Sequence, residues 1–459
     1  MNYFQGGRMD SEFSSSTRII ALNDLDGKDF EVTVIGGGIT GAGIANILAE
    51  NGITTLLLEK GDFACGTSSG SSKLVHGGLR YLQSGRFVEV YRLLHERNYL
   101  MNHTGIVKPL EFHILTGATM WSSVELGIGI SIYNAMSGKN PIVRHHHNNG
   151  EYPGEINGFY SYIDGITVDS ELVIYNIVSA YRHGAICLNY SEAASIEKSD
   201  GRYRVGIKDT LSGKSYNISS KILINAAGPW GNDILKLAGM PEEENFRLSK
   251  GIHLVFPFTV WNRKNAVVIK SPIDGRQLFI IPSGEVAYLG TTDVFVTDPE
   301  DFSVQKEDIE YLIDSVKDLF PDFTSENITA TFSGIRVLLG PGNDPGKISR
   351  DFSIRANENF ISVLGGKITD YRVGARKTAK IVSKLLGKNM KIKNMPYIDY
   401  SRESDDVDHI IKYECPLKPE DILRRRLAVR LYSADSGKSM EDEIRKKIGG
   451  THEDTYTGK

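Results

Sequence analysis

The chain has 459 residues, of which 40% are hydrophobic and 24% are charged, and its formal net charge is −4. These values are ordinary for a folded globular protein and argue against wholesale disorder and against a polytopic membrane protein. A chain of this length holds about three domains' worth of material, and the near-balance of charge gives no sign of bulk nucleic-acid binding.

The N-terminal stretch, residues 1–16, is polar and rich in serine, and it lacks the apolar core of a secretory signal. Asn2–Gly6 resembles the remnant of an engineered protease-cleavage tag. We therefore expect residues 1–16 to be a tag or disordered and exclude them from the fold. Elsewhere no uncharged apolar run reaches the roughly 20 residues that a membrane-spanning helix needs. The nearest candidate, residues 126–138, is too short.

The three cysteines, Cys65, Cys187 and Cys415, are widely spaced and form neither a metal-binding pattern nor a disulfide framework. This usage is typical of a reducing compartment. We expect a cytoplasmic protein without a metal site.

The first recognisable unit is a strand, a glycine-rich turn, a helix and a second strand. Residues 31–35 are rich in β-formers, apolar residues from Ile39 to Leu48 recur near a 3.6-residue period, and residues 54–58 form a second apolar run. The order predicts two parallel strands joined by a helix, about 30 residues in all.

The turn of this unit reads Gly36-x-Gly38-x-x-Gly41, and Glu59 ends the second strand. Gly36 permits the tight turn, Gly38 lets a pyrophosphate approach the backbone, and Gly41 lets helix and strand pack closely. The pyrophosphate would lie at the helix N-terminus, with Glu59 on the ribose. These residues predict a dinucleotide site without separating NAD from FAD.

A run rich in serine and glycine follows, residues 66–82, and it also carries Lys73, His76 and Arg80 among apolar residues. A flexible linker would explain the serines and glycines. It would not explain the cations, so we interpret the run as a ligand-contacting segment.

The rest of the chain alternates between helices and strands. We expect helices at 86–100, 168–182, 306–319 and 369–386, a hairpin at 203–219, buried strands at 221–225 and 360–364, a strand-rich region at 246–300, and a charged helical segment at 418–447.

Several blocks of the sequence together resemble the FAD-dependent glycerol-3-phosphate dehydrogenase and oxidase family. They are the glycine motif and residues 71–82 (SSKLVHGGLRYL), 225–230 (NAAGPW), 250–253 (KGIH), 289–293 (LGTTD), 333–336 (SGIR) and 365–372 (GGKITDYR). Residues 72–82 and 365–372 are the most specific of these, and the resemblance covers about residues 30–430.

The resemblance implies an α/β fold, α+β overall. A Rossmann-like FAD domain would be built from 30–105, 165–245 and 330–395, and an antiparallel substrate domain from 106–164 and 246–329. A short helical appendix would follow at 396–459. The implied FAD-binding residues are Gly36, Gly38, Ile39, Thr40, Gly41, Glu59, Lys60, Thr67, Ser68, Ser71, Ser72, Lys73, Leu74, His76, Gly77, Ala227, Gly228, Gly334, Gly366, Lys367, Ile368 and Thr369.

The implied reaction is oxidation of sn-glycerol 3-phosphate at C2 to dihydroxyacetone phosphate. A phosphate dianion needs fixed cations, and arginine suits bidentate recognition. Arg80 and Arg336 are therefore our candidates, joined by Tyr81, Thr291, Thr292 and Arg372 as substrate-binding residues.

Alcohol oxidation also needs a proton acceptor, and a histidine suits that role. His253 is our first choice and His76 the second. Lys367 would stabilise negative charge near the flavin or substrate. We thus place His253, Arg336 and Lys367 in the catalytic set.

Two departures from the family pattern keep other functions open. Asp370 stands where the family often has threonine, and the C-terminal region is short. An FAD-dependent oxidase or dehydrogenase of an amino acid or 2-hydroxy acid, and an FAD-binding protein without turnover, are the alternatives. Quinone, oxygen or a soluble carrier could accept the electrons, and a homodimer is compatible with the sequence.

Two further runs, one of histidines and one of arginines, can be explained as solvent-exposed segments. His145, His146 and His147 precede Asn148-Asn149-Gly150, so we expect a solvated loop. Arg424, Arg425 and Arg426 could meet anionic lipid at the cytoplasmic face of a membrane. A solvated helix face explains these three arginines equally well.

Overall fold

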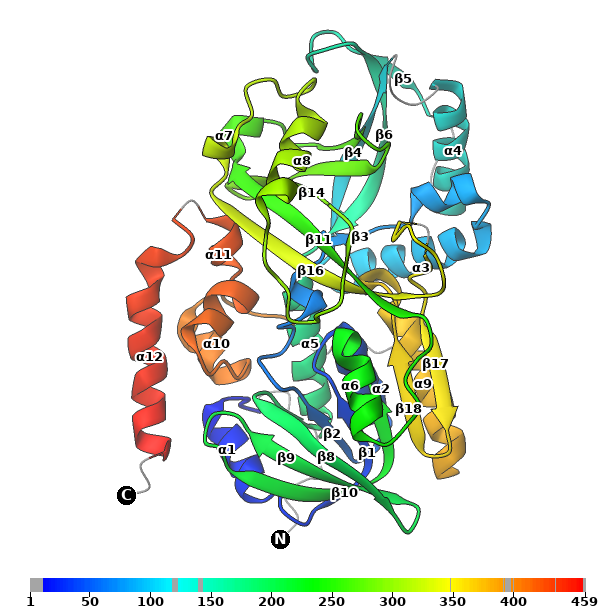
Figure 1. Ribbon diagram of the computed structural model, residues 1–459. Helices are drawn as coiled ribbons and strands as arrows, with labels where there is room; N and C mark the ends of the chain where they lie inside the picture. Colours follow the sequence, from blue (N-terminus) through cyan, green and yellow to red (C-terminus); the bar gives the residue numbers. More distant parts are fainter. Residues whose placement is uncertain are drawn as a thin grey trace.

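The computed structural model describes residues 11–456 except 118–122, 139–142, 347, 391, 393–397, 399 and 434. Two sheets organise it, with a C-terminal helical segment along one side (Figure 1). This arrangement confirms the expected α/β fold class.

The first sheet contains the glycine motif. Its path runs β17 (Ser353–Asn357), β18 (Phe360–Leu364), β10 (Ser215–Asn225), β1 (Asp29–Ile35), β2 (Thr55–Leu58) and β7 (Ile186–Leu188). The strands from β18 to β7 pair in parallel, as the βαβ pattern predicts. The N-terminal part of β10 leaves this layer and pairs antiparallel with β9 (Arg202–Asp209), which in turn pairs with β8 (Ser191–Ser199).

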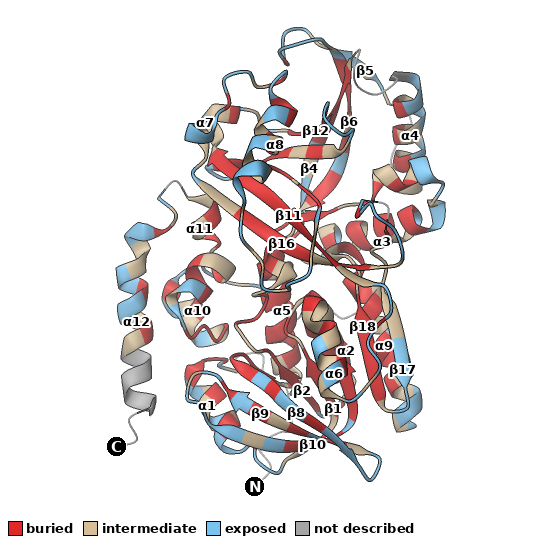
Figure 2. Cartoon of the chain, viewed as in Figure 1, coloured by how far each residue is buried: buried red, intermediate tan, exposed pale blue. Residues whose placement is uncertain are grey.

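Three helices cover one face of the parallel strands: α2 (Ile39–Glu50), α5 (Asp169–Arg182) and α9 (Tyr371–Leu386). Figure 2 shows β1, β18 and α5 as largely buried. α6 (Gly231–Leu237) contacts β8 and β10. Gly43 makes the close approach of α2 and α9 possible, because a Cβ there would lie 2.7 Å from the ring of Tyr371.

The second sheet is mostly antiparallel and carries the other wall of the site. Its path is β15 (Val294–Val296), β11 (Phe246–Pro257), β14 (Val286–Gly290), β13 (Gln277–Ser283), β12 (Ala266–Lys270), β4 (Lys108–Gly117), β6 (Ile156–Ile166) and β3 (Leu74–Val75), with β16 (Ala330–Leu339) on β11 and β5 (His145–His147) on β6.

The expected domain boundaries do not follow the sheets. β3 and β16 lie within the ranges assigned to the FAD domain, 30–105 and 330–395, yet both pair with strands of the second sheet. The chain therefore crosses between the two sheets at the serine-rich run 66–82 and at the block 333–336, which carries an arginine. These crossings bring both segments to the space between the sheets.

Helices α3 (Phe87–His103), α4 (Ser123–Met136), α7 (Phe258–Trp261) and α8 (Lys306–Val316) belong with the second sheet (Figure 1). The run 145–147 is a short strand rather than the expected loop. His146 stacks on Phe159 at 5.0 Å between ring centroids, and the Nε2 of His145 lies 2.8 Å from the Oγ1 of Thr116.

The expectation that residues 1–16 lie outside the fold is wrong for residues 11–16; the tag-like residues 2–6 lie outside the described residues. Phe13 is buried and exchanges backbone hydrogen bonds with the C-terminal segment, its N–H to Lys412 and its carbonyl from Cys415. α1 (Ser15–Asn23) begins directly after it, capped by the Ser14 side chain.

The C-terminal segment is broken rather than one helix over 418–447. It comprises α10 (Val407–Tyr413), a π-helical turn η6 (Asp421–Arg426), α11 (Val429–Tyr432) and α12 (Lys438–Tyr456). Ala428 and Gly437 adopt positive φ of 56° and 70°, which interrupts the helix. Arg426 is buried and forms an ion pair with Asp62, and Arg425 donates to the same carboxylate at 2.6 Å. The lipid-facing and solvated interpretations of Arg425 and Arg426 are therefore both wrong.

Candidate active site

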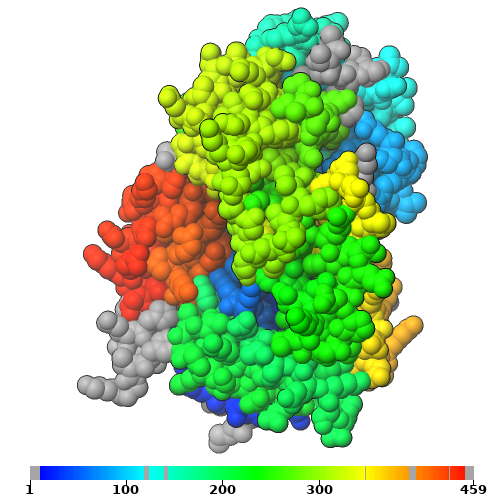
Figure 3. Space-filling model, viewed as in Figure 1, coloured from blue at the N-terminus to red at the C-terminus, as the bar shows by residue number. Residues whose placement is uncertain are grey.

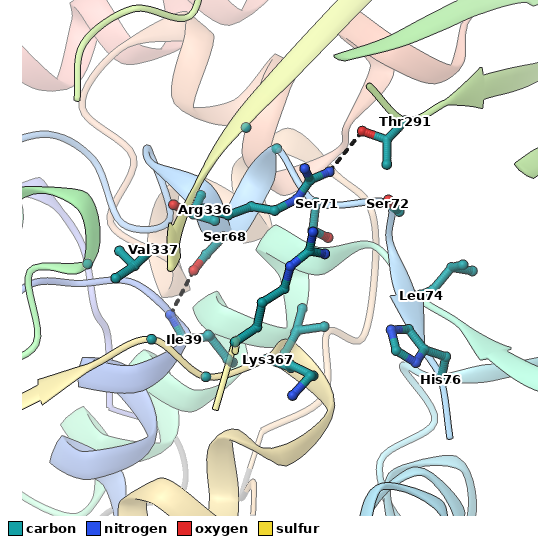
Figure 4. A pocket seen from close by; sticks show the side chains of 18 of the residues that line it. Ile39, Ser68, Ser71, Ser72, Leu74, His76, Thr291, Arg336, Val337 and Lys367 are labelled. Atoms are coloured by element: carbon teal, nitrogen blue, oxygen red, sulfur yellow. Dashed lines mark hydrogen bonds between the residues drawn. The ribbon is translucent and has the colours of Figure 1, made fainter. Parts of the chain in front are cut away.

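The glycine turn after β1 leaves the N-terminus of α2 open. Gly36 has φ +112°, and a Cβ there would collide with the Ala226 backbone. Gly38 precedes the helix and supplies no capping side chain. Ser68 instead accepts the Ile39 N–H at 3.0 Å, as Figure 4 shows. The turn thus presents backbone donors and the positive helix end to the space above it.

Glu59 stands at the end of β2, beside that turn. Its two carboxylate oxygens accept backbone N–H groups, from Gly37 at 2.7 Å and from Gly61 at 2.9 Å. Burial raises the pKa of Glu59, and these bonds oppose the rise. The carboxylate is held rigidly at the edge of the cavity, where a ribose would approach.

A cavity of about 900 Å³ extends from this corner to the second sheet. Most of the predicted site residues line it, from both sheets. They are Gly36, Gly38, Ile39, Thr40, Glu59, Lys60, Thr67, Ser68, Ser71, Ser72, Leu74, His76, Arg80, Tyr81, Ala227, Gly228, Thr291, Gly334, Arg336, Gly366, Lys367 and Ile368.

The residues present fit FAD. The cavity is elongated from the helix N-terminus to the cationic wall, and glycines stand where the backbone must come close to a ligand or to itself. A Cβ at Gly334 would collide with the Gly70 carbonyl, and one at Gly366 with the Phe352 ring. A helix N-terminus for the pyrophosphate and a buried carboxylate for the ribose complete the set.

The far wall carries a cluster of arginines around one aspartate. Arg336 donates from Nη1 to the Oδ1 of Asp293 at 3.1 Å and from Nη2 to the Oγ1 of Thr291 at 2.8 Å. Arg350 donates to the Oδ2 of Asp293 at 2.6 Å, and Arg276 lies 3.5 Å from the same oxygen. All of these residues line the cavity.

The cluster carries an excess of positive charge. Burial lowers the pKa of Arg350 to about 10, and the neighbouring Arg336 adds to the effect. The guanidinium groups also keep the pKa of Asp293 low, against its burial. One carboxylate cannot neutralise three guanidinium groups, so the wall is prepared for a further anion.

Sequence reasoning missed Arg276, Arg350 and Asp293. Asp293 belongs to the quoted LGTTD block, which was a usable signal. Arg276 and Arg350 lie outside every recognised block, and only the tertiary fold brings them to Arg336.

His76 points into the cavity beside Lys367 (Figure 4). Burial lowers the pKa of His76 to about 3, helped by Arg80 and Lys367. Its imidazole is therefore neutral at physiological pH. The Oγ1 of Thr369 accepts the His76 backbone N–H at 3.1 Å and so fixes this stretch of chain. Thr369 itself does not line the cavity.

His253, our first choice for the proton acceptor, lies behind the cavity wall. Its Nε2 is 3.0 Å from the Oγ of Ser72, and its ring stacks on Phe332 with centroids 4.5 Å apart. Ser72 lines the cavity and His253 does not. Strand β11 directs the histidine toward the packed side of β16, so His253 can act on a ligand only through Ser72.

Lys367 lines the cavity, but carboxylates already hold its ammonium group. Its Nζ is 2.9 Å from the Oε1 of Glu89 and 3.1 Å from the Oδ1 of Asp351. Asp370, the departure from the family pattern, accepts the Lys367 backbone N–H and pairs with Arg92 at 3.0 Å. Asp370 thus stabilises the turn that presents Lys367.

Five other predicted residues lie off the cavity. Lys73 forms a buried ion pair with Asp169 at 2.6 Å, and Arg372 lies on Glu96 and on the ring of Tyr99, so neither cation faces a ligand. Those two assignments are corrected to structural roles. Gly41, Gly77 and Thr292 support the wall from behind. Gly41 packs against the Gly36 carbonyl, the Gly77 N–H donates to the Tyr133 hydroxyl, and the Thr292 hydroxyl accepts the Ile252 N–H.

Comparisons with known proteins show the family of the chain. The family profile described as FAD dependent oxidoreductase matches residues 31–367. The aerobic glycerol-3-phosphate dehydrogenase of Bacillus subtilis is 34% identical over 421 residues, which cover 84% of this chain and 74% of that protein. The Staphylococcus haemolyticus protein of the same name is 33% identical, covering 83% and 71%.

The chain belongs to the FAD-dependent glycerol-3-phosphate dehydrogenase family. It is accordingly an FAD-dependent oxidoreductase, and the resemblance in its sequence blocks is confirmed.

Solved structures show the same fold. The glycerol-3-phosphate dehydrogenase of Bacillus halodurans, complexed with FAD, superposes with a TM-score of 0.77 at 24% identity, covering 96% of this chain and 95% of that one. An L-alpha-glycerophosphate oxidase of Mycoplasma pneumoniae, also with FAD bound, gives a TM-score of 0.64 at 18% identity, covering 81% and 98%. Figure 1 therefore shows a fold that holds FAD in its relatives.

Proposed function

We propose that this protein oxidises sn-glycerol 3-phosphate at C2 to dihydroxyacetone phosphate. The observation that carries the proposal is the arginine wall around Asp293, which offers more positive charge than its own carboxylate balances. A phosphate dianion supplies the missing charge. The curated relatives are named for this substrate.

FAD, when bound, supplies the hydride acceptor for this chemistry. Arg336 and Arg350 bind the substrate phosphate, and Thr291 fixes the direction of Arg336 through its hydroxyl. His76 lines the same cavity as the arginine wall and lies within electrostatic range of Arg350, so it is available to the glycerol part of a substrate whose phosphate the wall holds. The neutral imidazole of His76 takes up the proton of the C2 hydroxyl.

The test of this function is a spectrum of the FAD-loaded protein under anaerobic conditions. Addition of sn-glycerol 3-phosphate should bleach the oxidised flavin bands. Glycerol, which lacks the phosphate, should bleach them far more slowly. An oxidase or dehydrogenase of amino or 2-hydroxy acids would instead bleach with alanine or lactate and not with glycerol 3-phosphate. A flavin that none of these reduces would contradict the proposal and support a protein without turnover.

The electron acceptor is the second part of the proposal. Exposed apolar side chains gather on α3 and α4 next to the cavity: Phe87, Val88, Tyr91, Val124, Ile128 and Ile132, from 37% to 84% exposed. The two helices contact one another, and Phe87, Ile128 and Ile132 also line the cavity. An apolar patch continuous with the site favours a quinone held at a membrane surface over a soluble carrier.

None of the described helices combines the length and the apolar character that a membrane-spanning helix needs. A membrane contact would therefore be peripheral. The double substitution Val88→Asn and Ile128→Asn should abolish co-sedimentation with phospholipid vesicles, because it removes two well-exposed members of the patch. Ile20→Asn, on α1 and 63% exposed, is the matched control and should leave binding intact. Equal loss in both variants, or no binding by the unmodified protein, would contradict the patch assignment.

A further inference from the structure

A second cavity, of about 290 Å³, lies where the C-terminal segment meets strand β16 and the 65–69 segment. Its wall combines η1 (Thr67–Ser69), β16 and η6, and includes Ser69, Thr331 and Arg424. In Figure 3 the orange C-terminal segment borders a hollow whose floor is blue. The volume equals that of about ten water molecules, so the cavity admits only a small molecule.

Arg424 is the unusual member of this wall. Its neighbours Arg425 and Arg426 both bind the buried carboxylate of Asp62, and Arg425 also binds Asp421 at 2.5 Å. Arg424 makes no hydrogen bond and no ion pair with any residue that the structure describes. Arg424 is half-buried, so its guanidinium group is partly desolvated without a paired charge to compensate the cost.

The nearby carboxylates do not compensate Arg424. Asp169 and Glu420 are close enough to raise the pKa of Arg424, but burial outweighs them and lowers it. Asp169 forms an ion pair with Lys73 at 2.6 Å, and Glu420 forms one with Arg430 at 3.0 Å. Glu420 and Arg425 also line the cavity, but each has an ion-pair partner outside the cavity wall, so Arg424 is the charged residue of the wall that has none within the described chain.

Hydroxyl groups line the same cavity as this charge. The Thr331 hydroxyl has no hydrogen-bond partner within the described chain, and the Ser69 hydroxyl makes only a long bond of 3.4 Å to the Gly66 carbonyl. Phe302 and Phe332 supply an apolar side. A guanidinium group together with hydroxyl groups is the donor set that recognises phosphate and carboxylate groups.

We propose that this second cavity binds a small oxyanion, the phosphate or carboxylate group of a metabolite, with Arg424 as its main ligand and Thr331 and Ser69 as further donors. The site is separate from the arginine wall around Asp293. It does not depend on the identity of the oxidised substrate.

The second cavity adjoins the FAD site through a shared segment of chain. Cys65 and Gly66 line both cavities, so an occupant would lie across the 65–69 segment from the FAD site. By joining η6 to this segment, a bound oxyanion would hold the FAD-facing residues Thr67 and Ser68 in place. Occupation should therefore slow the release of FAD.

The test is equilibrium dialysis of the FAD-loaded protein against labelled inorganic phosphate. The unmodified protein should bind two phosphates, one at each cationic site. Arg424→Gln and Arg336→Gln should each bind one, and the double variant none. Arg445→Gln, on α12 and paired at the surface with Glu441, is the matched control and should bind two.

Each deviation has a distinct meaning. Two phosphates bound by Arg424→Gln, or a single phosphate in the unmodified protein that Arg336→Gln removes, would overturn the second site. Failure of Arg336→Gln to remove a phosphate would count against the proposed function alone. As an independent readout, phosphate should slow FAD release in Arg336→Gln but not in the double variant; equal release rates would overturn the link to the cofactor.

Discussion

Arg336→Gln should lower kcat/KM for glycerol 3-phosphate by about thirtyfold to several thousandfold, since a buried charged hydrogen bond contributes roughly 2–5 kcal/mol. Arg336 is the member of the wall with three hydrogen bonds, to Asp293, to Thr291 and to the Thr292 carbonyl. Glutamine keeps the stem and one donor but loses the charge and the two-pronged geometry. Steady-state rates with an artificial electron acceptor measure the effect.

The control for Arg336→Gln is Arg355→Gln, an arginine 65% exposed and paired with Glu243 away from the cavity. It should leave kcat/KM within twofold of the unmodified enzyme. The slow oxidation of glycerol, which has no phosphate, should respond little to Arg336→Gln. A parallel fall in both substrates would mean that Arg336 supports the fold or the FAD rather than the phosphate.

His76→Asn should lower kcat by about a hundredfold to ten-thousandfold, the range over which a positioned proton acceptor contributes. His253→Asn should cost less than about tenfold, because Ser72 separates His253 from the cavity. Rapid mixing of each FAD-loaded variant with glycerol 3-phosphate measures the rate of flavin bleaching directly. The reverse order of effects would restore His253 as the proton acceptor.

The pH dependence of flavin bleaching separates the same two roles. With a pKa of about 3, caused first by burial and then by Arg80 and Lys367, His76 is deprotonated and able to accept a proton above about pH 4. Its titration therefore imposes no acid limb on kcat between pH 5 and pH 8. The second ionisation of a phosphate ester, near pH 6, should instead set the acid limb of kcat/KM. An acid limb in kcat near pH 6.5 would show a histidine that titrates in the complex.

Local sequence patterns predicted the dinucleotide-binding turn because that turn depends only on the conformations of neighbouring residues. Gly36 needs a positive φ, and the strand before it and the helix after it follow from residue periodicity. The choice between His76 and His253 was not local. Both stand in recognised blocks, and only the pairing of β11 with β16 shows that His253 faces Phe332.

The roles of charged residues were the part of the site that the sequence predicted least well. Lys73 and Arg372 looked like ligand-binding cations, yet Asp169 and Glu96, each distant in sequence, neutralise them in the interior. Arg276 and Arg350 lie outside every recognised block, yet the fold brings both to the cavity. Whether an arginine faces a ligand depends on which carboxylate the tertiary structure brings to it, and no spacing rule encodes that.

The contact between Asp62 and the arginines of η6 has a consequence for the order of events on the ribosome. Asp62 lies just before the segment that contacts the cofactor, and its counter-charges, Arg425 and Arg426, are more than 360 residues away. During translation this carboxylate stays without these partners until residues 425 and 426 have been synthesised. Nascent chains that end before residue 421 should therefore acquire FAD poorly, so that capture of the cofactor follows the synthesis of η6.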